Sequence, residues 1–460
     1  MTITRDLVAW AWDLRHDAIP PEVRRRAAVL ALDGIGNALA AAHLGTVPFA
    51  EPVARALGLG GDSTVLGSTG RLPATGAALA NGILVHGLDF DDTHTAGLVH
   101  ATAVTLPSAL AVAQREDATG ADLVRALVVG YELVGRLGRV APHGFHAKGF
   151  HATSVCGTFT AALVTALLSG LDPEQAVHAL GIAGSQSSGS MEFLATGAST
   201  KQIHPGWASL AGIVAAGLAA AGATGPDSIL EGERGLYVLH SAVPADLGAL
   251  TADLGSTWQV HDVEVKPYPA CHLLHRSLDV AQALHATVDP ADVTEVVVRV
   301  AADSVPIVAA PAATKQRPRS AYEAKFSVQW SVAAMLVDGE VGVETYRSDR
   351  IDRPEVRTLA ERVRYEPVTD DVPAAEQPGD IEVVLSGGRT TRLRSTDPGV
   401  QRPGGTEETV MGKFATNTAG APGTERLAAA VLGLDDAPDL AELTAALDAQ
   451  AGARQLEHSA

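Results

Sequence analysis

Apolar residues recur three and four positions apart over most of the first half of the chain, a spacing that places them on one face of an α-helix. Short polar joints separate these segments. In two places a proline stands where a helix is expected to begin: Pro20-Pro21-Glu22 and Asp172-Pro173-Glu174. The missing N–H of proline is tolerated at this position. Thr119 starts another segment of this kind. The pattern predicts successive helices to about residue 237.

Near residue 259 the pattern changes to one that includes strands. Residues 293–300 are β-branched and almost continuously apolar, as in a strand buried on both faces. Residues 381–386 and 389–393 flank Gly387-Gly388, and two glycines in a two-residue turn predict a β-hairpin.

Helical spacing is found in four further segments: 321–337, 355–363, 427–434 and 440–447. We therefore predict a mainly α fold with a large all-helical domain formed by both chain ends. This domain comprises residues 1–259 and returns at residues 401–460, and a smaller α+β domain at residues 260–400 is inserted between them.

The composition narrows the possible partners. The chain of 460 residues has 34 Lys and Arg against 53 Asp and Glu, a net charge of −19, which argues against a nucleic-acid partner bound by bulk electrostatics. Two cysteines and no apparent signal segment suggest a cytoplasmic protein. The longest uncharged apolar run, residues 207–223, is rich in Ala and Gly, so we expect a buried core helix and no membrane partner.

Several cofactor motifs are missing or incomplete. Gly58-Leu59-Gly60-Gly61 lacks the third glycine of a dinucleotide fingerprint and follows a helical segment. Residues 184–190 contain no Gly-x-Ser-x-Gly elbow. Two cysteines are too few for a typical iron–sulfur cluster. Any lyase chemistry is therefore expected to proceed without a cofactor.

Lysine is rare, with six residues against 28 arginines, and an ammonium can lose its proton where a guanidinium cannot. Lys201 lies in a polar segment, residues 199–206, just ahead of an apolar helix, and helix N-termini favour anions. Lys266 starts Lys266-Pro267-Tyr268-Pro269-Ala270-Cys271-His272 at the expected domain junction, where clefts tend to form. Both lysines are candidates for binding a carboxylate.

Histidines and carboxylates also cluster. Asp89-Phe90-Asp91-Asp92-Thr93-His94 precedes His100, and His151 precedes another apolar helix. The acidic segment suits either a divalent metal or carboxylates that orient imidazoles. We favour the second, because Thr95 breaks the Asp-Asp-x-x-Asp spacing. Imidazoles and ammonium groups together can move a proton next to a carboxylate and stabilise the resulting anion, which points to a small polycarboxylate substrate.

Five motifs in this order resemble the MmgE/PrpD family, which includes 2-methylcitrate dehydratase, cis-aconitate decarboxylase and iminodisuccinate epimerase. They are residues 89–94, 149–153, 200–206, 266–271 and 323–330. The resemblance covers nearly the whole chain. It implies a helical domain from both ends, an α+β lid domain, a homodimer, and a pocket at the domain interface.

The resemblance also implies site residues. Those expected to act in catalysis are His100, His151, Lys201 and Lys266, and those expected to bind substrate are Asp89, Thr93, His272, His275 and Tyr322. One departure concerns Cys271, which stands where the decarboxylase has a histidine. His272 or His275 is a candidate for that role, and the departure argues against decarboxylase activity more than against the family.

The leading hypothesis is a cofactor-independent hydro-lyase of the 2-methylcitrate dehydratase type, with no metal ion. One alternative is an epimerase acting at a carbon next to a carboxylate, because it uses the same deprotonation. Another is a decarboxylase of the cis-aconitate type. A protein that only binds carboxylates is the non-enzymatic alternative. The sequence does not assign which histidine is the acid and which the base.

Overall fold

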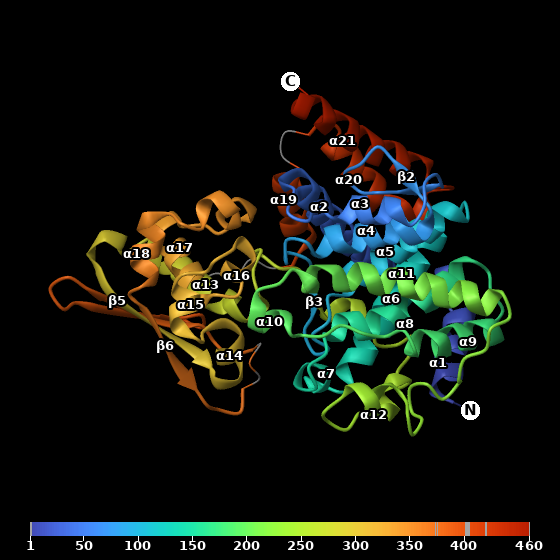
Figure 1. The fold of residues 1–460 in the computed structure, drawn as a ribbon, viewed down its shortest axis with the longest axis horizontal. Helices are drawn as coiled ribbons and strands as arrows, with labels where there is room; N and C mark the ends of the chain where they lie inside the picture. Colours follow the sequence, from blue (N-terminus) through green and yellow to red (C-terminus); the bar gives the residue numbers. More distant parts are fainter. Residues whose placement is uncertain (1, 373, 375, 401–404, 419–420, 460) are drawn as a thin grey trace. The chain divides into compact units, whose positions relative to one another are not determined.

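The computed structural model describes residues 2–372, 374, 376–400, 405–418 and 421–459. The chain divides into two compact units, and Figure 1 traces both. Unit 1 comprises residues 1–193, 200–265 and 405–460, and unit 2 comprises residues 194–199 and 266–404. The short segment 194–199, at helix α10 (Phe193–Thr196), was not expected in the second unit. The predicted return to the helical domain at residue 401 falls on residues outside those described.

Unit 1 is almost entirely helical, as the sequence predicts. Its helices are α1 (Ile3–Asp13), α2 (Pro21–Leu44), α3 (Ala50–Ala56), α4 (Ala74–His86), α5 (Ala101–Arg115), α6 (Gly120–Arg139), α7 (Gly144–Ala147), α8 (Ala152–Leu168), α9 (Pro173–Gly184), α11 (Thr200–Ala220), α12 (Leu236–His240), α19 (Glu407–Asn417), α20 (Thr424–Leu432) and α21 (Ala441–Ser459). Two short antiparallel pairs accompany them: β1 (Ser63–Thr64) with β2 (Arg71–Leu72), and β3 (Thr93–His94) with β4 (Val263–Glu264).

Both ends of the chain contribute to unit 1. Helices α19 and α20 pack against α2, and α21 packs on α20, so the red and dark-blue helices lie together in Figure 1. Thr119 begins α6 with a capping box closed by Asp122, and Asp172 begins α9 in the same way with Gln175. These caps satisfy N–H groups that would otherwise lack partners.

Helix α11 packs against α4, α5, α8 and α9. Small residues allow it to approach α4 closely: a Cβ added to Gly82 would lie 2.6 Å from the Gly206 Cα, and one added to Gly206 would lie 2.3 Å from the Leu79 carbonyl oxygen. Any larger side chain at these two positions would push the helices apart. The first turn of α11 is thereby held beside the C-terminal end of α4.

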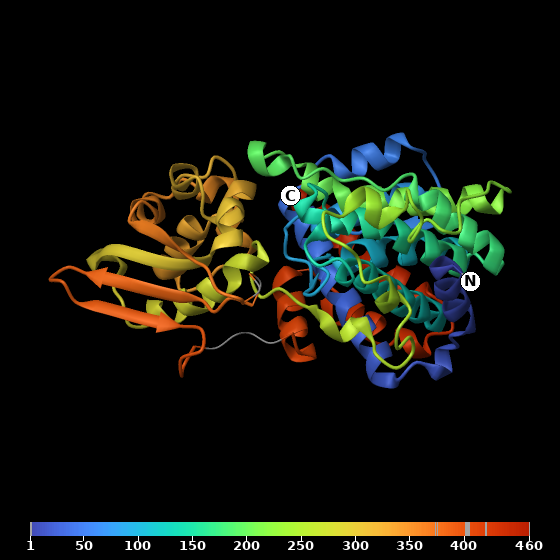
Figure 2. The same cartoon turned by 90° about the horizontal axis from the view of Figure 1, so that it is seen from below.

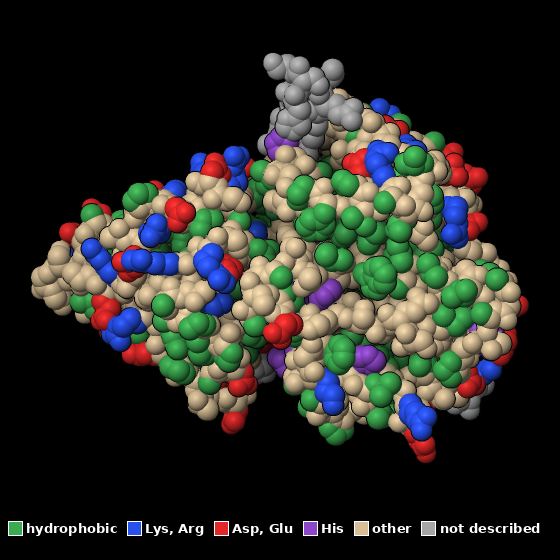
Figure 3. All heavy atoms as spheres, in the orientation of Figure 1, with side chains coloured by type: hydrophobic (Ala, Val, Ile, Leu, Met, Phe, Trp, Pro, Cys, Tyr) green, Lys and Arg blue, Asp and Glu red, His purple; other side chains and the backbone are tan. Residues whose placement is uncertain are grey.

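Two helices, α2 and α11, are long and apolar enough to cross a membrane, but 83% and 61% of their apolar windows are buried. This burial is typical of core helices. The outer side of α11 exposes Trp207, Val214 and Leu218, and Figure 3 shows hydrophobic side chains over this part of unit 1.

Unit 2 contains a four-stranded sheet in the order β6-β5-β7-β8. Its strands are β5 (Val293–Ala301), β6 (Val363–Val368), β7 (Asp380–Leu385) and β8 (Thr390–Arg394). β5 pairs in parallel with β6 and antiparallel with β7. The strand predicted at 293–300 and the hairpin around Gly387-Gly388 are confirmed.

Helices cover one face of this sheet (Figure 2). They are α13 (His275–His285), α14 (Val305–Val308), α15 (Ala312–Gln316), α16 (Ala321–Ala324), α17 (Val328–Asp338) and α18 (Pro354–Ala360). α13 and α17 pack together and contact the sheet. Their apolar residues and the inner face of the sheet form one core.

Two helix predictions in unit 2 were wrong in part. The helix predicted at 321–337 is broken, because the Ser327 hydroxyl accepts the Trp330 N–H (2.9 Å) and starts α17 as a new helix. The helix predicted at 355–363 ends at Ala360. The following residues form β6, which the sequence did not predict, since its hydrogen bonds go to a strand 67 positions earlier.

Candidate active site

An acidic loop, residues 87–92, joins α4 to β3 in unit 1. Its three carboxylates belong to Asp89, Asp91 and Asp92, and all three side chains are fully buried. Asp89 has a φ of 52°, a left-handed conformation uncommon outside glycine. Buried anions are costly unless they are paired, and each of these has its own partner.

Asp89 is paired with Lys201. The Lys201 ammonium donates to Asp89 Oδ1 at 2.7 Å, and the Lys201 side chain is 9% exposed. The sequence placed Lys201 ahead of the helix, but it lies in the first turn of α11. Next to it, the Gln202 amide donates to the Gly87 carbonyl at 2.8 Å. The first turn of α11 therefore holds the start of the acidic loop.

A second lysine, Lys413, contacts the acidic loop. The Lys413 ammonium, on α19, lies 2.8 Å from Asp33 Oδ1, donates to the Phe90 carbonyl at 2.6 Å and lies 3.7 Å from the centre of the Phe90 ring. Asn37 also donates to that carbonyl, at 3.2 Å. Burial lowers the pKa of Lys413, and the Asp33 carboxylate opposes this shift. Sequence reasoning did not identify Lys413, because 323 residues separate it from Phe90.

Asp92 holds the beginning of α5. Its carboxylate accepts the Thr102 N–H at 3.1 Å and also bonds the Thr102 hydroxyl. That hydroxyl lies 2.7 Å from the Tyr131 hydroxyl. Burial raises the pKa of Asp92 to about 7. Asp92 is therefore partly protonated at neutral pH and serves to fix the helix.

Four histidines surround this loop, and we call them the imidazole cluster: His86, His100, His151 and His204. The ring centres of His86 and His100 lie 4.5 Å apart, those of His100 and His151 5.8 Å, and those of His151 and His204 5.3 Å. His100 and His151 each precede a helix, α5 and α8. The structure therefore brings together four of the predicted residues, Asp89, His100, His151 and Lys201.

Sequence reasoning missed His86 and His204 as site residues. His204 follows Lys201 by three positions, a spacing that puts both on one face of a helix, so this signal was available. His86 is the last residue of α4 and is fully buried. Nothing in its local sequence distinguishes it from a core histidine.

The charge states of the cluster follow from burial and from the nearby ammonium group. Burial first, and the charge of Lys201 second, lower the pKa of His151 well below its usual value. Burial chiefly, with contributions from His86 and Lys201, lowers the pKa of His204 to about 4. Nδ1 of His151 lies 3.1 Å from Nδ1 of His204, so one of them donates to the other. Both rings are neutral at pH 7, and a bound anion would favour their protonation.

Four residues near the loop place possible ligand atoms within 4.8 Å of one another, so we considered whether they bind a metal ion. They are His86, Asp89, Asp91 and His100. The Asp89 carboxylate is already paired with an ammonium, and the Asp91 carboxylate contacts two imidazoles. Both carboxylates thus have partners that a metal ion would displace. We assign no metal to this cluster.

Thr93 lies in β3, directly after the acidic loop, and is buried. Its hydroxyl has no hydrogen-bond partner among the described residues. Such a group usually has a ligand or water as its partner, which agrees with the predicted role in substrate binding.

The other predicted residues belong to unit 2. Lys266 is 1% exposed, and Tyr322 is half-buried on α16 with its ring centre 5.5 Å from that of Phe326. Nε2 of His275 lies 3.1 Å from the Ala270 carbonyl and donates to it, whereas His272 is half-buried before α13. That these residues share a pocket with Lys201 stays a prediction.

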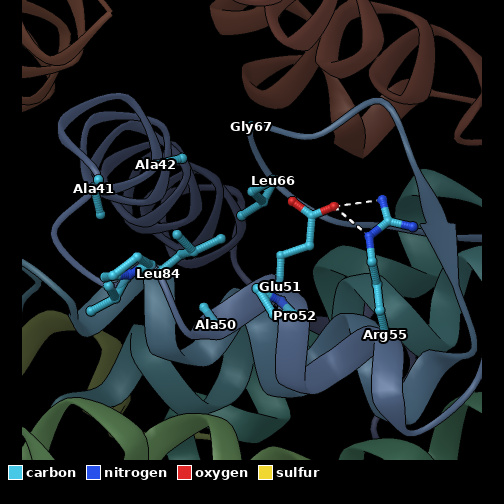
Figure 4. Close-up of a pocket in the computed structure, with 12 residues that line it drawn as sticks. Ala41, Ala42, Ala50, Glu51, Pro52, Arg55, Leu66, Gly67 and Leu84 are labelled. Carbon is cyan, nitrogen blue, oxygen red and sulfur yellow. Dashed lines mark hydrogen bonds and ion pairs between the residues drawn. The ribbon is translucent and has the colours of Figure 1, made fainter.

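A surface pocket of about 420 Å³ lies elsewhere in unit 1 and is shown in Figure 4. Residues of α2, α3 and α4 line it, and on α3 Arg55 donates to Glu51 at 2.7 Å. It contains none of the predicted site residues. The candidate site is therefore defined by the acidic loop and the imidazole cluster.

One histidine near the loop is expected to make stability depend on pH. Gly97 N–H donates to His94 Nδ1 at 3.0 Å, and His94 Nε2 lies 3.2 Å from Gln259 Oε1. Burial lowers the pKa of His94 from 6.5 to about 4. Below pH 6.5 the unfolded chain binds this proton and the folded chain does not, so the free energy of unfolding should fall by about 1.4 kcal/mol per pH unit for this group until about pH 4.

Urea unfolding at pH 7 and pH 5 checks this expectation. A His94→Gln variant should lose less stability on acidification than the unchanged protein. Equal losses in the two proteins would contradict the assignment to His94.

Comparison with known proteins supports the motif resemblance. Residues 5–245 match the MmgE/PrpD N-terminal domain, and residues 268–436 match the MmgE/PrpD C-terminal domain. The cis-aconitate decarboxylase of Homo sapiens is 33% identical over 404 residues, which cover 84% of this chain and 82% of that protein. That of Aspergillus terreus is 28% identical over 389 residues, 78% of this chain and 77% of the relative. The cis-aconitate decarboxylase-like protein oryM of Aspergillus oryzae is 27% identical over 475 residues, 97% and 98% of the two chains.

Proposed function

Because the chain belongs to the MmgE/PrpD family, we propose that it is a carboxy-lyase that removes CO₂ from cis-aconitate or a closely related small polycarboxylate. The relatives named as cis-aconitate decarboxylases support this reading over dehydration, which the sequence alone favoured. The observation that carries it is the buried Lys201 ammonium, held by Asp89 beside two neutral imidazoles. We expect the protein to act as a cytoplasmic homodimer.

The reaction has two requirements. When a C–C bond to a carboxylate breaks, CO₂ leaves and its electron pair remains on the substrate carbon, where the neighbouring double bond and carboxylate share it. A cation lowers the energy of this anion most in a site shielded from water. A proton must then be added to carbon by a positioned acid. One ammonium group that stabilises the anion and one imidazolium that donates the proton therefore meet both requirements.

We assign these two requirements to different groups. Lys201 is fixed by Asp89 and supplies positive charge. His151 and His204 are neutral and share a hydrogen bond, so they suit the binding of carboxylates as hydrogen-bond donors. His100 contacts the Asp91 carboxylate, and a nearby anion favours its protonated form. His100 is therefore the proposed acid, and its lost proton is replaced from solvent.

A hydro-lyase is the second candidate, and Cys271 is the observation that favours it. This residue stands where the resemblance to the decarboxylase predicts a histidine, and it is a half-buried thiol. Elimination of water would use the same residues differently, with a neutral imidazole as the base and His100 as the acid that protonates the departing hydroxyl.

A single experiment separates the candidates. The protein is incubated in heavy water with cis-aconitate, and separately with 2-methylcitrate and citrate, while CO₂ release and proton NMR are recorded. We expect one CO₂ for each cis-aconitate consumed and one solvent deuteron bound to carbon in the product. EDTA should leave this rate unchanged, because no metal takes part in the proposed reaction.

Other outcomes have defined meanings. New alkene signals from 2-methylcitrate without CO₂ would replace the proposal by the hydro-lyase. Deuterium exchange without net conversion would indicate an epimerase. No change in any of these acids would contradict a lyase of this substrate class.

A further inference from the structure

The fully buried carboxylate of Asp91 contacts two imidazoles. Its oxygens lie 2.8 and 3.0 Å from Nδ1 of His86, and one of them lies 3.4 Å from Nδ1 of His100. Among the described residues, the side-chain contacts of the Asp91 carboxylate are with these two rings. A carboxylate at this depth is costly without compensating groups, so the arrangement requires hydrogen on the Nδ1 atom of His86.

A separate hydrogen bond fixes the tautomer of His100. Its Nδ1 lies 2.9 Å from the Asp92 carbonyl oxygen, which can only accept a hydrogen bond. The proton of a neutral His100 is therefore on Nδ1, and Nε2 carries the lone pair. This is the atom at which His100 gains a proton and from which it can give one up.

The second ring nitrogen of His86, Nε2, has an unusual environment. With Nδ1 bonded to Asp91, its Nε2 is buried and has no hydrogen-bond partner among the described side chains and backbone. Its ring centre lies 4.5 Å from that of His100 and 5.9 Å from that of His151. A buried nitrogen without a partner is energetically unfavourable. An apolar residue at this position would avoid that cost, which argues for a role beyond packing.

We propose that Asp91 is a positioning residue for His100: its carboxylate, held by His86, sets the affinity of His100 for a second proton on Nε2. The Asp92 carbonyl keeps the first proton on Nδ1. This inference rests on the proposed function, in which that second proton is the one transferred to the substrate carbon. His100 loses it as the C–H bond forms and regains it from solvent.

Other charged or titratable groups face this pair. They are Asp89, Lys201 and His204 at the start of α11, His151 before α8, His146 on α7, Asp92 in the same loop, Tyr131 on α6, and Lys413 with Asp33 below the loop. Lys201 and the imidazoles disfavour a positive charge on His100. Because Asp89 is neutralised by Lys201 and Asp33 by Lys413, and because Asp92 is partly protonated, Asp91 is the carboxylate that most favours this charge.

The test uses two variants with opposite expected effects. Asp91→Asn removes the anion, so the alkaline limb of the pH profile of kcat/KM should move to lower pH by roughly 1–3 units, and kcat should fall by about 10–100-fold with little change in KM. His86→Gln keeps a donor for Asp91 but removes the competing imidazole, so the limb should move to higher pH. A loss of packing alone would not produce shifts of opposite sign.

A second measurement does not depend on turnover. NMR titration of the labelled histidines, with the His100 signal identified from a His100→Gln variant, reports the protonation of His100 directly. It should shift in the same directions as the activity profile. If cis-aconitate were not a substrate, the proposed function would fail while this titration still decided the role of Asp91.

Asp92→Asn is the matched control, since the Asp92 carboxylate bonds Thr102, and asparagine retains the backbone carbonyl that accepts from His100. It should move the His100 titration less than Asp91→Asn does. An unchanged titration in both Asp91→Asn and His86→Gln, or shifts of the same sign, would overturn the inference.

Discussion

Replacing Lys201 by methionine should abolish most turnover and destabilise unit 1 at the same time. The variant loses the cation that we propose stabilises the anion formed as CO₂ leaves, which should lower kcat by about 10²–10³-fold. It also leaves Asp89 buried without its ion-pair partner, and breaking a buried pair in this way costs about 3–5 kcal/mol. Steady-state kinetics and urea unfolding measure the two effects separately.

The double variant Asp89→Asn with Lys201→Met separates the two roles. Because it removes both charges, it should recover much of the stability lost in the single variant. Its activity should stay as low as that of Lys201→Met. Recovery of turnover together with stability would mean that Lys201 serves only to neutralise Asp89.

The second large effect is expected for His151. Replacing it by leucine keeps a side chain of similar size but removes the hydrogen bond that we propose it donates to a substrate carboxylate. A hydrogen bond to a charged group contributes about 1.5–3 kcal/mol, so we expect kcat/KM to fall by roughly 10–100-fold, with a smaller change in stability because no buried charge is left unpaired. Single-turnover kinetics with cis-aconitate would show whether the chemical step itself has slowed.

His143 provides the control for this variant. It is exposed, precedes α7 and has a φ of 60°, which asparagine tolerates well. His143→Asn should therefore keep the activity of the unchanged protein. An equal loss of activity in both variants would show that the His151 effect is not specific to the cluster.

Much of the fold follows from local patterns in the sequence. Prolines at helix starts, capping residues such as Thr119, and the β-branched run at 293–300 all act within one turn or one strand, so they are readable without a structure. β6 is the counterexample. Its residues alternate weakly, and what makes them a strand is the parallel pairing with β5.

The candidate site likewise contains residues that the sequence predicts and residues that only the structure identifies. Lys201, His100 and His151 stand in short motifs with helix starts, and the structure places them together with Asp89. His86 and Lys413 were missed because their roles depend on partners. The contact of His86 with Asp91 joins two residues that are close in the sequence, and only the structure shows that the His86 ring also lies beside that of His100. Lys413 reaches the loop only through the packing of α19 on α2.

The support that Lys413 gives to the Phe90 carbonyl has a consequence for how the protein matures. The acidic loop is translated early, but the ammonium group beneath it belongs to residue 413. While the ribosome is still making the intervening segments, Asp33 lacks its counter-ion and the loop lacks this anchor. The nascent chain should therefore complete the candidate site only after α19 has emerged and docked, however early the preceding helices assemble.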